Sequence, residues 1–333
     1  MSDEPDLEAR VALAIATWSD EDEDAFDAAF AALPHTGDAG LALGQRLVAS
    51  GDPMERALGA RILGAVINPD PEHVRDVVDA CLPLAAGEQD PLVLAAAIGA
   101  LHFASERIAV DAVALHVDHP NAGVRLAVAR ALPPTPHDEI DPSAFVPQLL
   151  ALSTDEDENV RDWACFQLGR QLPEIDTPEL RAALAARLDD PHEDTRCEAI
   201  VGLASRHDPR ALPPLLAMLE AGSSLTLLVE AAAWIGDASL VPHLLDFASD
   251  DEVEAALDRC DPERRTRRAA RNRELVAALA THGITAKIEL SAFEDEVSWE
   301  RADGRWSADV ERVLARPDVN GDIEAAAAHL AAP

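Results

Sequence analysis

The chain has 333 residues, of which 62 are acidic and 27 are basic, so its formal net charge at pH 7 is −35. A surface this negative repels nucleic-acid phosphates and anionic lipid headgroups, which argues against both as partners and favours a basic protein. Solubility, a saline cytoplasm or a GC-rich genome would produce the same charge, and these explanations remain open.

Aromatic residues make up 4% of the chain and tyrosine is absent. A chain rich in alanine and poor in aromatic and β-branched residues favours closely packed helices over sheets. Residues 1–10 lack the basic and apolar regions of a signal peptide, and the longest apolar run, 92–104, is too short to span a bilayer. The four cysteines form no CxxC pair. We therefore expect a cytoplasmic protein with reduced thiols.

The N-terminal residues predict two helices, over about 6–18 and 20–33. Val11, Leu13, Ala14 and Trp18 share an apolar face of the first helix, and Ser19 can cap the second. The acidic run 20–24 falls at the positive end of that second helix, which favours a structural role over metal binding.

From His35 onward, amphipathic stretches follow one another in pairs. We predict helices over residues 41–50 with 52–67, 71–86 with 91–105, 106–117 with 122–132, 143–153 with 160–172, 178–188 with 195–205, and 210–219 with 225–235. A seventh first helix, over 240–248, contains Pro242 and is expected to have an irregular partner.

Asp261-Pro262 and Gly283 are start and stop signals for a helix over about 262–282. Between Arg259 and Arg273, seven arginines stand against two acidic residues. Because no aromatic residues interleave with them, we expect acidic residues of the tail to compensate this charge rather than a nucleic acid. The candidates are Glu294, Asp295 and Glu296.

The tail after Lys287 departs from the helical pattern. Residues 288–307 predict a β-hairpin with Asp303-Gly304 at its turn and with Trp299 and Trp306 on either side. Short helices over 308–315 and 322–331 are expected to follow.

One pattern of residues, which we call the repeat frame, recurs in the second helix of each predicted pair. In its clearest copy, residues 154–170, the side chains of Val160, Ala164 and Leu168 lie four residues apart and share one helix face. The anchor position of this copy is Arg161, and a leucine or isoleucine follows each anchor by seven residues. The equivalent anchors, spaced by 31 to 38 residues, are Arg56, Leu94, Arg125, Arg196 and Leu228. A period of this size predicts a solenoid of helical hairpins.

The frame resembles the HEAT repeat, in the short bacterial form known as the HEAT-like repeats of phycobilin lyases. The resemblance is clearest over residues 38–250 and implies an all-α fold, an α-solenoid with a right-handed superhelix. We expect residues 1–285 to form this solenoid and residues 286–333 to form a small C-terminal cap. In that family a proline bends the first helix of each pair, and Pro147 and Pro214 match it by position.

The resemblance also implies a ladder of hydrogen bonds between neighbouring repeats, made by an aspartate six residues before the arginine. By position, Asp155 and Asp190 match this aspartate, opposite Arg161 and Arg196. Asp52 and Asp90 lie only four residues before their anchors, and Leu94 and Leu228 cannot donate. We therefore expect the ladder to be interrupted at those repeats.

Relatives of the HEAT fold include enzymes of the lyase and oxidoreductase kinds, which remain the alternative function. Di-iron hydroxylases need several facing His-Glu pairs, and this chain has one, His192-Glu193. The loop residues His116, Asp118 and His119 could hold a metal, but such side chains are more often solvated. Cys165 fits a buried face, and no phosphate-binding, nucleophile or dinucleotide motif is present. We predict no catalytic residue, metal or cofactor.

Since no catalytic residue is predicted, the remaining candidates for function are residues on the surface of the second helices. On the second helix of each pair, offsets three, four and seven from the anchor face the core, so offsets two, five and six look toward the concave side or its rim. These offsets give seven candidate partner-binding residues: Arg61, Arg130, Trp163, Phe166, Glu198, Glu230 and Trp234. Tryptophan and arginine are typical of interface hot spots. Trp163 and Trp234 could instead fill gaps between helices. We predict a non-catalytic scaffold that presents an acidic concave surface to a basic protein partner.

Overall fold

The structure is a computed structural model that describes residues 4–19, 23–67, 71–104, 107–132, 140–223, 225–247, 251–301 and 304–332. The chain divides into two compact units, Met1–Ile175 (unit 1) and Asp176–Pro333 (unit 2). The sequence patterns did not predict this division. The run 20–24 and the turn Asp303-Gly304 fall partly outside the described residues.

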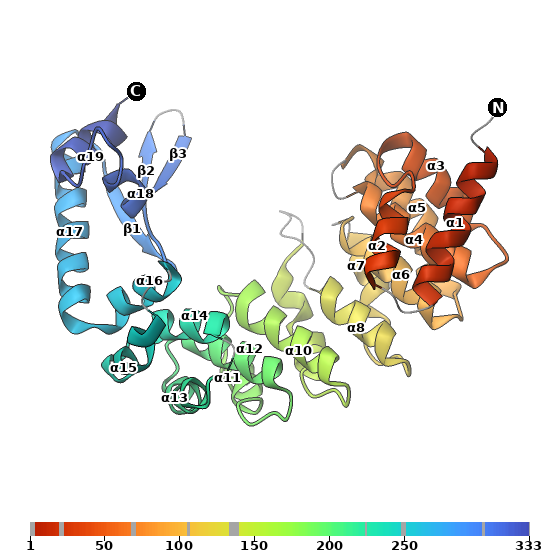
Figure 1. The fold of residues 1–333 in the computed structure, drawn as a ribbon, viewed down its shortest axis with the longest axis horizontal. Coiled ribbons are helices and arrows are strands. Elements are labelled where there is room, and N and C mark those ends of the chain that lie inside the picture. The colour runs from red at the N-terminus through yellow and green to blue at the C-terminus, as the bar shows by residue number, and fades with distance from the viewer. Residues whose placement is uncertain are drawn as a thin grey trace. The chain divides into compact units, whose positions relative to one another are not determined.

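Unit 1 begins with α1 (Glu4–Ser19) and α2 (Glu23–Ala31), which pack against each other. Four helical hairpins follow (Figure 1): α3 (Gly37–Val48) with α4 (Pro53–Ile67), α5 (Val74–Gly87) with α6 (Pro91–His102), α7 (Arg107–Ala114) with α8 (Ala122–Ala131), and α9 (Val146–Leu152) with α10 (Glu158–Phe166). Short turns of 3-10 helix, η1 (Pro71–His73) and η2 (Pro142–Phe145), lead into α5 and α9, and a π-helical turn, η3 (Gln167–Gln171), ends α10.

The hairpins of unit 1 stack in two layers. The second helices lie side by side, α4 against α6, α6 against α8 and α8 against α10, while α3 contacts α5 and α5 contacts α7. Val160, Ala164 and Leu168, the face that defines the repeat frame, are fully buried. The helical-repeat architecture that the sequence predicts is therefore confirmed.

Unit 2 continues with the same kind of pair. Its elements are α11 (Pro178–Ala185), α12 (Glu193–Ala204), η4 (Pro209–Ala211), α13 (Leu212–Ala221), α14 (Leu225–Ile235), η5 (Ala238–Leu240), α15 (Val241–Leu244), η6 (Leu245–Phe247) and α16 (Asp251–Cys260). The expectation of an irregular partner after α15 was wrong, because α16 is a regular helix that packs against α14. Its apolar face is short, consisting of Val253, Ala256, Leu257 and Cys260, and acidic residues surround it in the sequence.

The rest of unit 2 combines one long helix with a small sheet. It consists of α17 (Pro262–Thr281), strands β1 (Ala286–Leu290), β2 (Asp295–Arg301) and β3 (Gly304–Asp309), and helices α18 (Val310–Leu314) and α19 (Ile323–Ala331). The strands pair antiparallel in the order β1-β2-β3, and Trp299 lies opposite Trp306. The predicted hairpin is thus β2–β3, and β1 adds a third strand. One hydrophobic core joins Leu275 and Leu279 of α17 to Val297 of β2 and Leu330 of α19.

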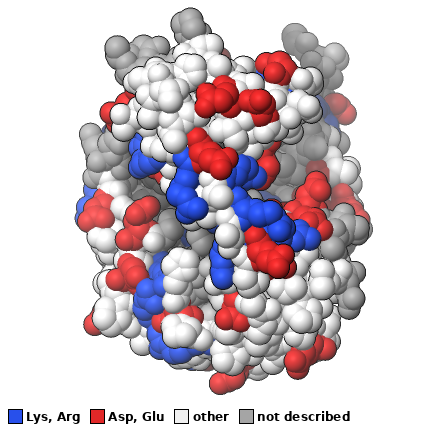
Figure 2. Space-filling model, turned by 90° about the vertical axis from the view of Figure 1, so that its left-hand side faces the viewer, with Lys and Arg blue, Asp and Glu red and all other residues white. Residues whose placement is uncertain are grey.

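The arginines around α17 find their acidic compensation within unit 2, as predicted. The carboxylate of Asp295, whose side chain is 1% exposed, accepts hydrogen bonds from Arg259 at 3.2 Å and Arg268 at 2.5 Å, and Arg271 lies 3.6 Å away. Figure 2 shows arginines gathered over α17 with carboxylates beside them, and Glu254 pairs with Arg264 at 2.6 Å. Of the three predicted acidic residues, Asp295 is the buried one, while Glu294 and Glu296 are exposed.

Within the described part of the chain, no helix combines the length and the apolar character that crossing a bilayer requires.

Candidate functional site

Four of the seven predicted surface residues belong to the second helices of unit 1. Arg61 lies on α4, Arg130 on α8, and Trp163 and Phe166 on α10. The two arginines are exposed and the two aromatic rings are half-buried. The structure brings three of these side chains, those of α8 and α10, into one cluster.

The centre of this cluster is the indole of Trp163. The guanidinium of Arg130 lies 4.8 Å from the indole centroid, and the Phe166 ring meets the indole edge-on at 5.4 Å. On the other side, the guanidinium of Arg170 lies 5.5 Å from the Phe166 centroid. Each cation–π contact of this kind contributes about 0.5–1 kcal/mol at exposed positions. We call these four side chains the Trp163 stack.

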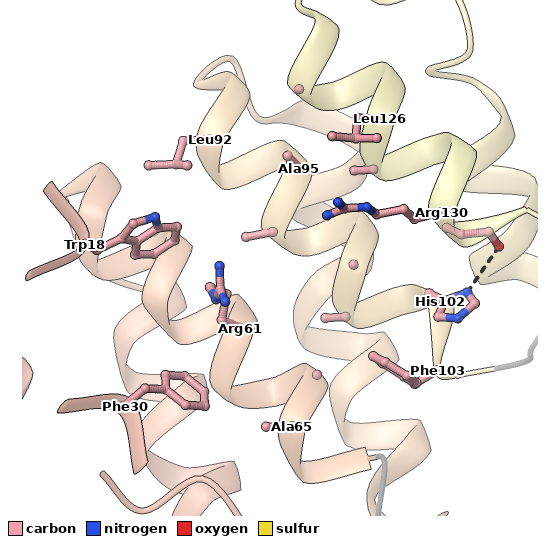
Figure 3. A pocket seen from close by; sticks show the side chains of 17 residues that line it. Trp18, Phe30, Arg61, Ala65, Leu92, Ala95, His102, Phe103, Leu126 and Arg130 are labelled. Carbon is pink, nitrogen blue, oxygen red and sulfur yellow. Dashed lines mark hydrogen bonds between the residues drawn. The ribbon is translucent and has the colours of Figure 1, made fainter. Parts of the chain in front are cut away.

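A pocket of about 600 Å³ opens beside the stack, on the face of the second helices that includes Arg61 (Figure 3). Its walls carry Trp18 from α1, Phe30 from α2, Leu92 from α6 and Leu126 from α8. Its floor consists of small residues from α4, α6 and α8: Gly64, Ala65, Ala95, Ala96, Gly99, Ala100, Gly123, Ala127 and Ala131. The absence of larger side chains along this floor leaves the space open.

Arg61 and Arg130 enter the pocket from α4 and α8, respectively (Figure 3). Arg61 is exposed overall, but its guanidinium lies 5.1 Å from the ring centroid of Trp18 and 4.8 Å from that of Phe26, and this partial burial lowers its pKa; Asp27 raises the pKa and the positive charge of Arg130 lowers it further. Burial likewise lowers the pKa of the Arg130 guanidinium. Both groups remain charged at neutral pH, so the pocket holds two cations that repel each other.

His102 and Phe103 lie at one end of the pocket. Nδ1 of His102 donates to the backbone oxygen of Ala131 at 3.2 Å, and the imidazole meets the Phe103 ring edge-on at 4.9 Å. Burial lowers the pKa of His102, an effect that the hydrogen bond to Ala131 opposes in part. His102 is therefore held in its neutral form, with Nε2 as an acceptor.

The sequence predicted some of the residues that line this pocket but not all of them. Arg61 and Arg130 lie at offset five from their anchors, and the floor residues Ala96, Gly99 and Ala127 lie at offsets two and five, as the helix period predicts for this face. The walls from α1 and α2 were missed, because these helices lie outside the repeat frame and only tertiary packing brings them to α4.

The other three predicted surface residues belong to unit 2. Glu198 of α12 is buried, with 8% of its surface exposed, while Glu230 and Trp234 of α14 are half-buried. The ring of Trp234 lies 6.5 Å from that of His207.

Arginine–carboxylate contacts connect neighbouring hairpins of unit 1. Nε and Nη2 of Arg125 donate to both carboxylate oxygens of Asp155, at 2.7 and 2.8 Å, and Nη1 donates to the backbone oxygen of His119 at 2.8 Å. Arg56 makes the equivalent contact with Glu88, at 2.9 Å. Glu88 lies six residues before Leu94, where the resemblance implies an aspartate, and its longer carboxylate makes the same contact. The expected interruption is therefore wrong for the contact between Arg56 and this repeat, whereas the side chain of Leu94 itself has no donor to offer the next repeat.

Asp52 and Asp90 have a different role. Their carboxylates accept hydrogen bonds from the backbone nitrogens of Met54, at 2.8 Å, and Leu92, at 2.9 Å, at the first turns of α4 and α6. An acidic residue four positions before the anchor is therefore a helix cap.

Arg161 and Arg196 share a local contact. Each donates from Nη1 to the backbone oxygen six residues earlier, of Asp155 at 2.9 Å and of Asp190 at 2.6 Å. The buried carboxylate of Asp190 accepts from the backbone nitrogen of His192 at 3.0 Å. These arginines thus hold the turns that precede α10 and α12.

The candidate metal and nucleophile residues are held by other contacts. A ring nitrogen of His116 lies 2.7 Å from the backbone oxygen of Ala85, and Nδ1 of His119 accepts from the backbone nitrogen of Asn121 at 3.1 Å. Nδ1 of His192 lies 3.1 Å from the hydroxyl of Thr195. Across the described ranges, no three His, Cys, Asp or Glu side chains converge on a metal position. Cys165 is fully buried, as predicted.

Comparisons with known proteins agree with this fold. Residues 146–228 match the family of HEAT repeats. Over 124 residues the chain is 32% identical to protein YibA of Escherichia coli K12, a match that spans 36% of this chain and 44% of YibA, so the chain matches less than half of this curated relative. The comparisons do not single out the phycobilin-lyase form of the repeat.

One solved structure shows a similar fold. The X-ray structure of Escherichia coli YibA matches 79% of this chain and 97% of its own chain, with 23% identity and a TM-score of 0.57. The condensin Cnd3–Cnd2 subcomplex of S. pombe matches 73% of this chain and 34% of its own, with 17% identity and a TM-score of 0.42. The likeness to YibA shows the fold alone.

Proposed function

We propose that this chain, a HEAT-repeat protein, is a non-catalytic scaffold that binds a protein partner through the second-helix face of unit 1. The observation that carries the proposal is the Trp163 stack, in which Trp163 and Phe166 are half-exposed and in contact with each other and with Arg130 and Arg170. Tryptophan and arginine dominate interface energies, and side chains already held in place lose little entropy on binding.

The proposal includes a basic partner. The net charge of −35 supports it, because opposite charge speeds encounter and suppresses wrong partners. In the turn before α10 and at its first residue, Glu158 is exposed, and the Glu156 side chain is 89% exposed although it lies 3.5 Å from Arg125. The partner would place an apolar side chain on the Trp163 stack and its basic groups over these carboxylates.

We further propose that Glu230 and Trp234, which are half-buried on α14, belong to a second contact surface on unit 2, whereas the burial of Glu198 removes it from the candidate surface residues. Residues 286–333 would then cap the repeats, a role that the shared core of α17, β2 and α19 supports. The scaffold would act in the cytoplasm, where its four buried, unpaired cysteines stay reduced.

The proposal is tested by affinity purification from the native host with wild-type protein and with Trp163→Ala. A partner contacting the stack should lose about 2 kcal/mol of binding free energy, roughly thirty-fold in Kd, with little change in Tm. Trp306→Ala is the matched control, because Trp306 is also exposed, at 47%, but lies on β3 of unit 2. A fall in Tm that accompanies the loss of binding would assign Trp163 to the core and refute the proposal.

A further inference from the structure

We propose that the pocket of unit 1 is a binding site for a small amphipathic carboxylate, with the carboxylate between Arg61 and Arg130 and an aromatic or aliphatic body against the apolar walls. This site goes beyond the docking of a protein partner. It is separate from the aromatic rings of Trp163 and Phe166, although Arg130 borders both.

The size and lining of the pocket fit a small molecule. Its volume of about 600 Å³ lies within the range of roughly 300–1,000 Å³ that is usual for small-molecule sites. Trp18, Phe30 and Leu92 supply apolar walls on one side and Leu126 on the other. Above the floor the space is open, since a Cβ added to Gly99 would meet no atom within 4 Å.

The two positive charges in the pocket, those of Arg61 and Arg130, favour an anionic ligand. Among the described residues, no carboxylate forms an ion pair with Arg61 or Arg130, although carboxylates outnumber basic residues in the chain by 62 to 27. Their guanidinium groups instead lie over aromatic rings, of Trp18 and Phe26 for Arg61 and of Trp163 for Arg130, which leaves their hydrogen-bond donors open to an anion. Asp27 attracts Arg61 from a greater distance, and Arg130 repels it. An anion between the two guanidinium groups would relieve this repulsion, and arginine binds carboxylates through paired hydrogen bonds.

The two features together define the ligand class. A hydrated inorganic anion would gain nothing from walls of tryptophan, phenylalanine and leucine, because it buries no apolar surface. A neutral apolar molecule would leave two charged groups without an acceptor, which costs free energy when they are desolvated. A molecule with one carboxylate and either one or two aromatic rings or a chain of about ten carbons satisfies both the walls and the arginines within the available volume.

The test measures binding to the full chain by isothermal titration calorimetry. The probes are naphthalene-2-carboxylate, indole-3-acetate and decanoate, with naphthalene-2-methanol as the neutral counterpart of the first. At least one carboxylate should bind at millimolar concentration or below, and naphthalene-2-carboxylate at least ten-fold more tightly than the alcohol. Failure of all three carboxylates to bind at about 1 mM, or equal affinity for carboxylate and alcohol, would overturn the proposal.

Variants locate the binding. Arg61→Gln and Arg130→Gln should each weaken carboxylate binding at least ten-fold and leave alcohol binding unchanged. Gly99→Leu should abolish the binding of both the carboxylate and the alcohol, because the new side chain fills the open space, and it leaves the Trp163 stack intact.

Arg267→Gln is the control, since the Arg267 side chain is 69% exposed on α17. Carboxylate binding that survives Gly99→Leu and both arginine variants would place the ligand elsewhere. Retention of partner binding by Gly99→Leu separates this site from the scaffold function.

Discussion

At the scale of single residues, glycine sets how closely the first two repeat helices approach. A Cβ on Gly59 of α4 would lie 2.7 Å from the Cβ of Leu47 and 2.7 Å from the backbone nitrogen of Val48, both on α3. Gly44 faces it, with the backbone oxygen of Gly59 at 3.2 Å from its own added Cβ. Neither backbone can move without separating the helices, so the small residue at offset three of the frame is a packing requirement.

We expect Gly59→Ala to lower the free energy of unfolding by about 2 to 3 kcal/mol, because the added methyl group overpacks a contact between backbones. Gly99→Ala, in the middle of α6 with nothing within 4 Å of the new methyl group, should raise it by about 0.5 to 1 kcal/mol. Urea denaturation of the two variants checks this contrast. Equal effects would mean that helix propensity rather than close approach governs both positions.

His102 gives unit 1 a pH-dependent stability. Its pKa is lower in the folded state than in the unfolded chain, where it has the ordinary histidine value of about 6.5. Between the folded pKa and pH 6.5 the unfolded chain therefore binds more protons than the folded chain. Stability should therefore be fully present above pH 6.5 and be lost as the pH falls through the folded pKa. The fall in Tm between pH 7.5 and 5.5 should be smaller in His102→Gln, which keeps a donor toward the Ala131 oxygen. An identical pH dependence in both proteins would contradict the assignment.

The sequence predicted the residues whose role follows from helix period alone. Val160, Ala164 and Leu168 are buried because a spacing of four places them on one face, whatever packs against it. Glu88 and Phe30 could not be assigned in this way. The first acts through Arg56 of the preceding hairpin, and the second reaches the pocket from a helix outside the repeat, so both roles depend on which helices meet.

At the scale of elements, caps and periodicity together predicted most helices. A helix such as α17 has a proline at its first position, a capping Asp261 and a glycine just beyond its end, all of which are local signals. The short strand β1 was missed because five residues carry too little alternation to distinguish a strand. It is fixed instead by pairing with β2, where Ile288 lies opposite Val297.

The contact between α17 and β2 depends on one carboxylate. Burial raises the pKa of Asp295, but the hydrogen bonds from Arg268 and Asn272 and the neighbouring charges outweigh this effect and lower it. We expect Asp295→Asn to cost about 3 to 5 kcal/mol, because it leaves Arg268 buried without its counter-charge. Glu294→Gln, at an exposed neighbouring position, should stay within about 0.5 kcal/mol. Thermal melts that shift equally for both would show that local charge, not the buried pair, matters.

At the scale of the whole molecule, charge is distributed in two ways. Some carboxylates form buried pairs with arginine, such as Asp155 with Arg125, whose side chains are 9% and 10% exposed, and these contacts are attractive. The excess that produces a net charge of −35 consists of carboxylates without a basic counterpart, and their mutual repulsion opposes the compact state. Salt screens the buried arginine–carboxylate pairs weakly and the exposed, unpaired carboxylates strongly, because the screening ions are in the solvent.

Salt should therefore stabilise this protein at neutral pH. Raising NaCl from 0.1 to 1 M shortens the screening length from about 10 to about 3 Å, which removes most of the repulsion between exposed carboxylates. We expect Tm at pH 7.5 to rise by at least about 4 °C, equivalent to roughly 1 to 2 kcal/mol. At pH 4.5, close to the isoelectric point of about 4.4, the net charge is near zero and the repulsion is absent. There the same salt should leave Tm unchanged or lower it, since attractive pairs are then the main interactions left to screen. A rise of equal size at both pH values would show that salt acts through hydration of apolar surface instead, and that the acidic surface adds no net destabilisation.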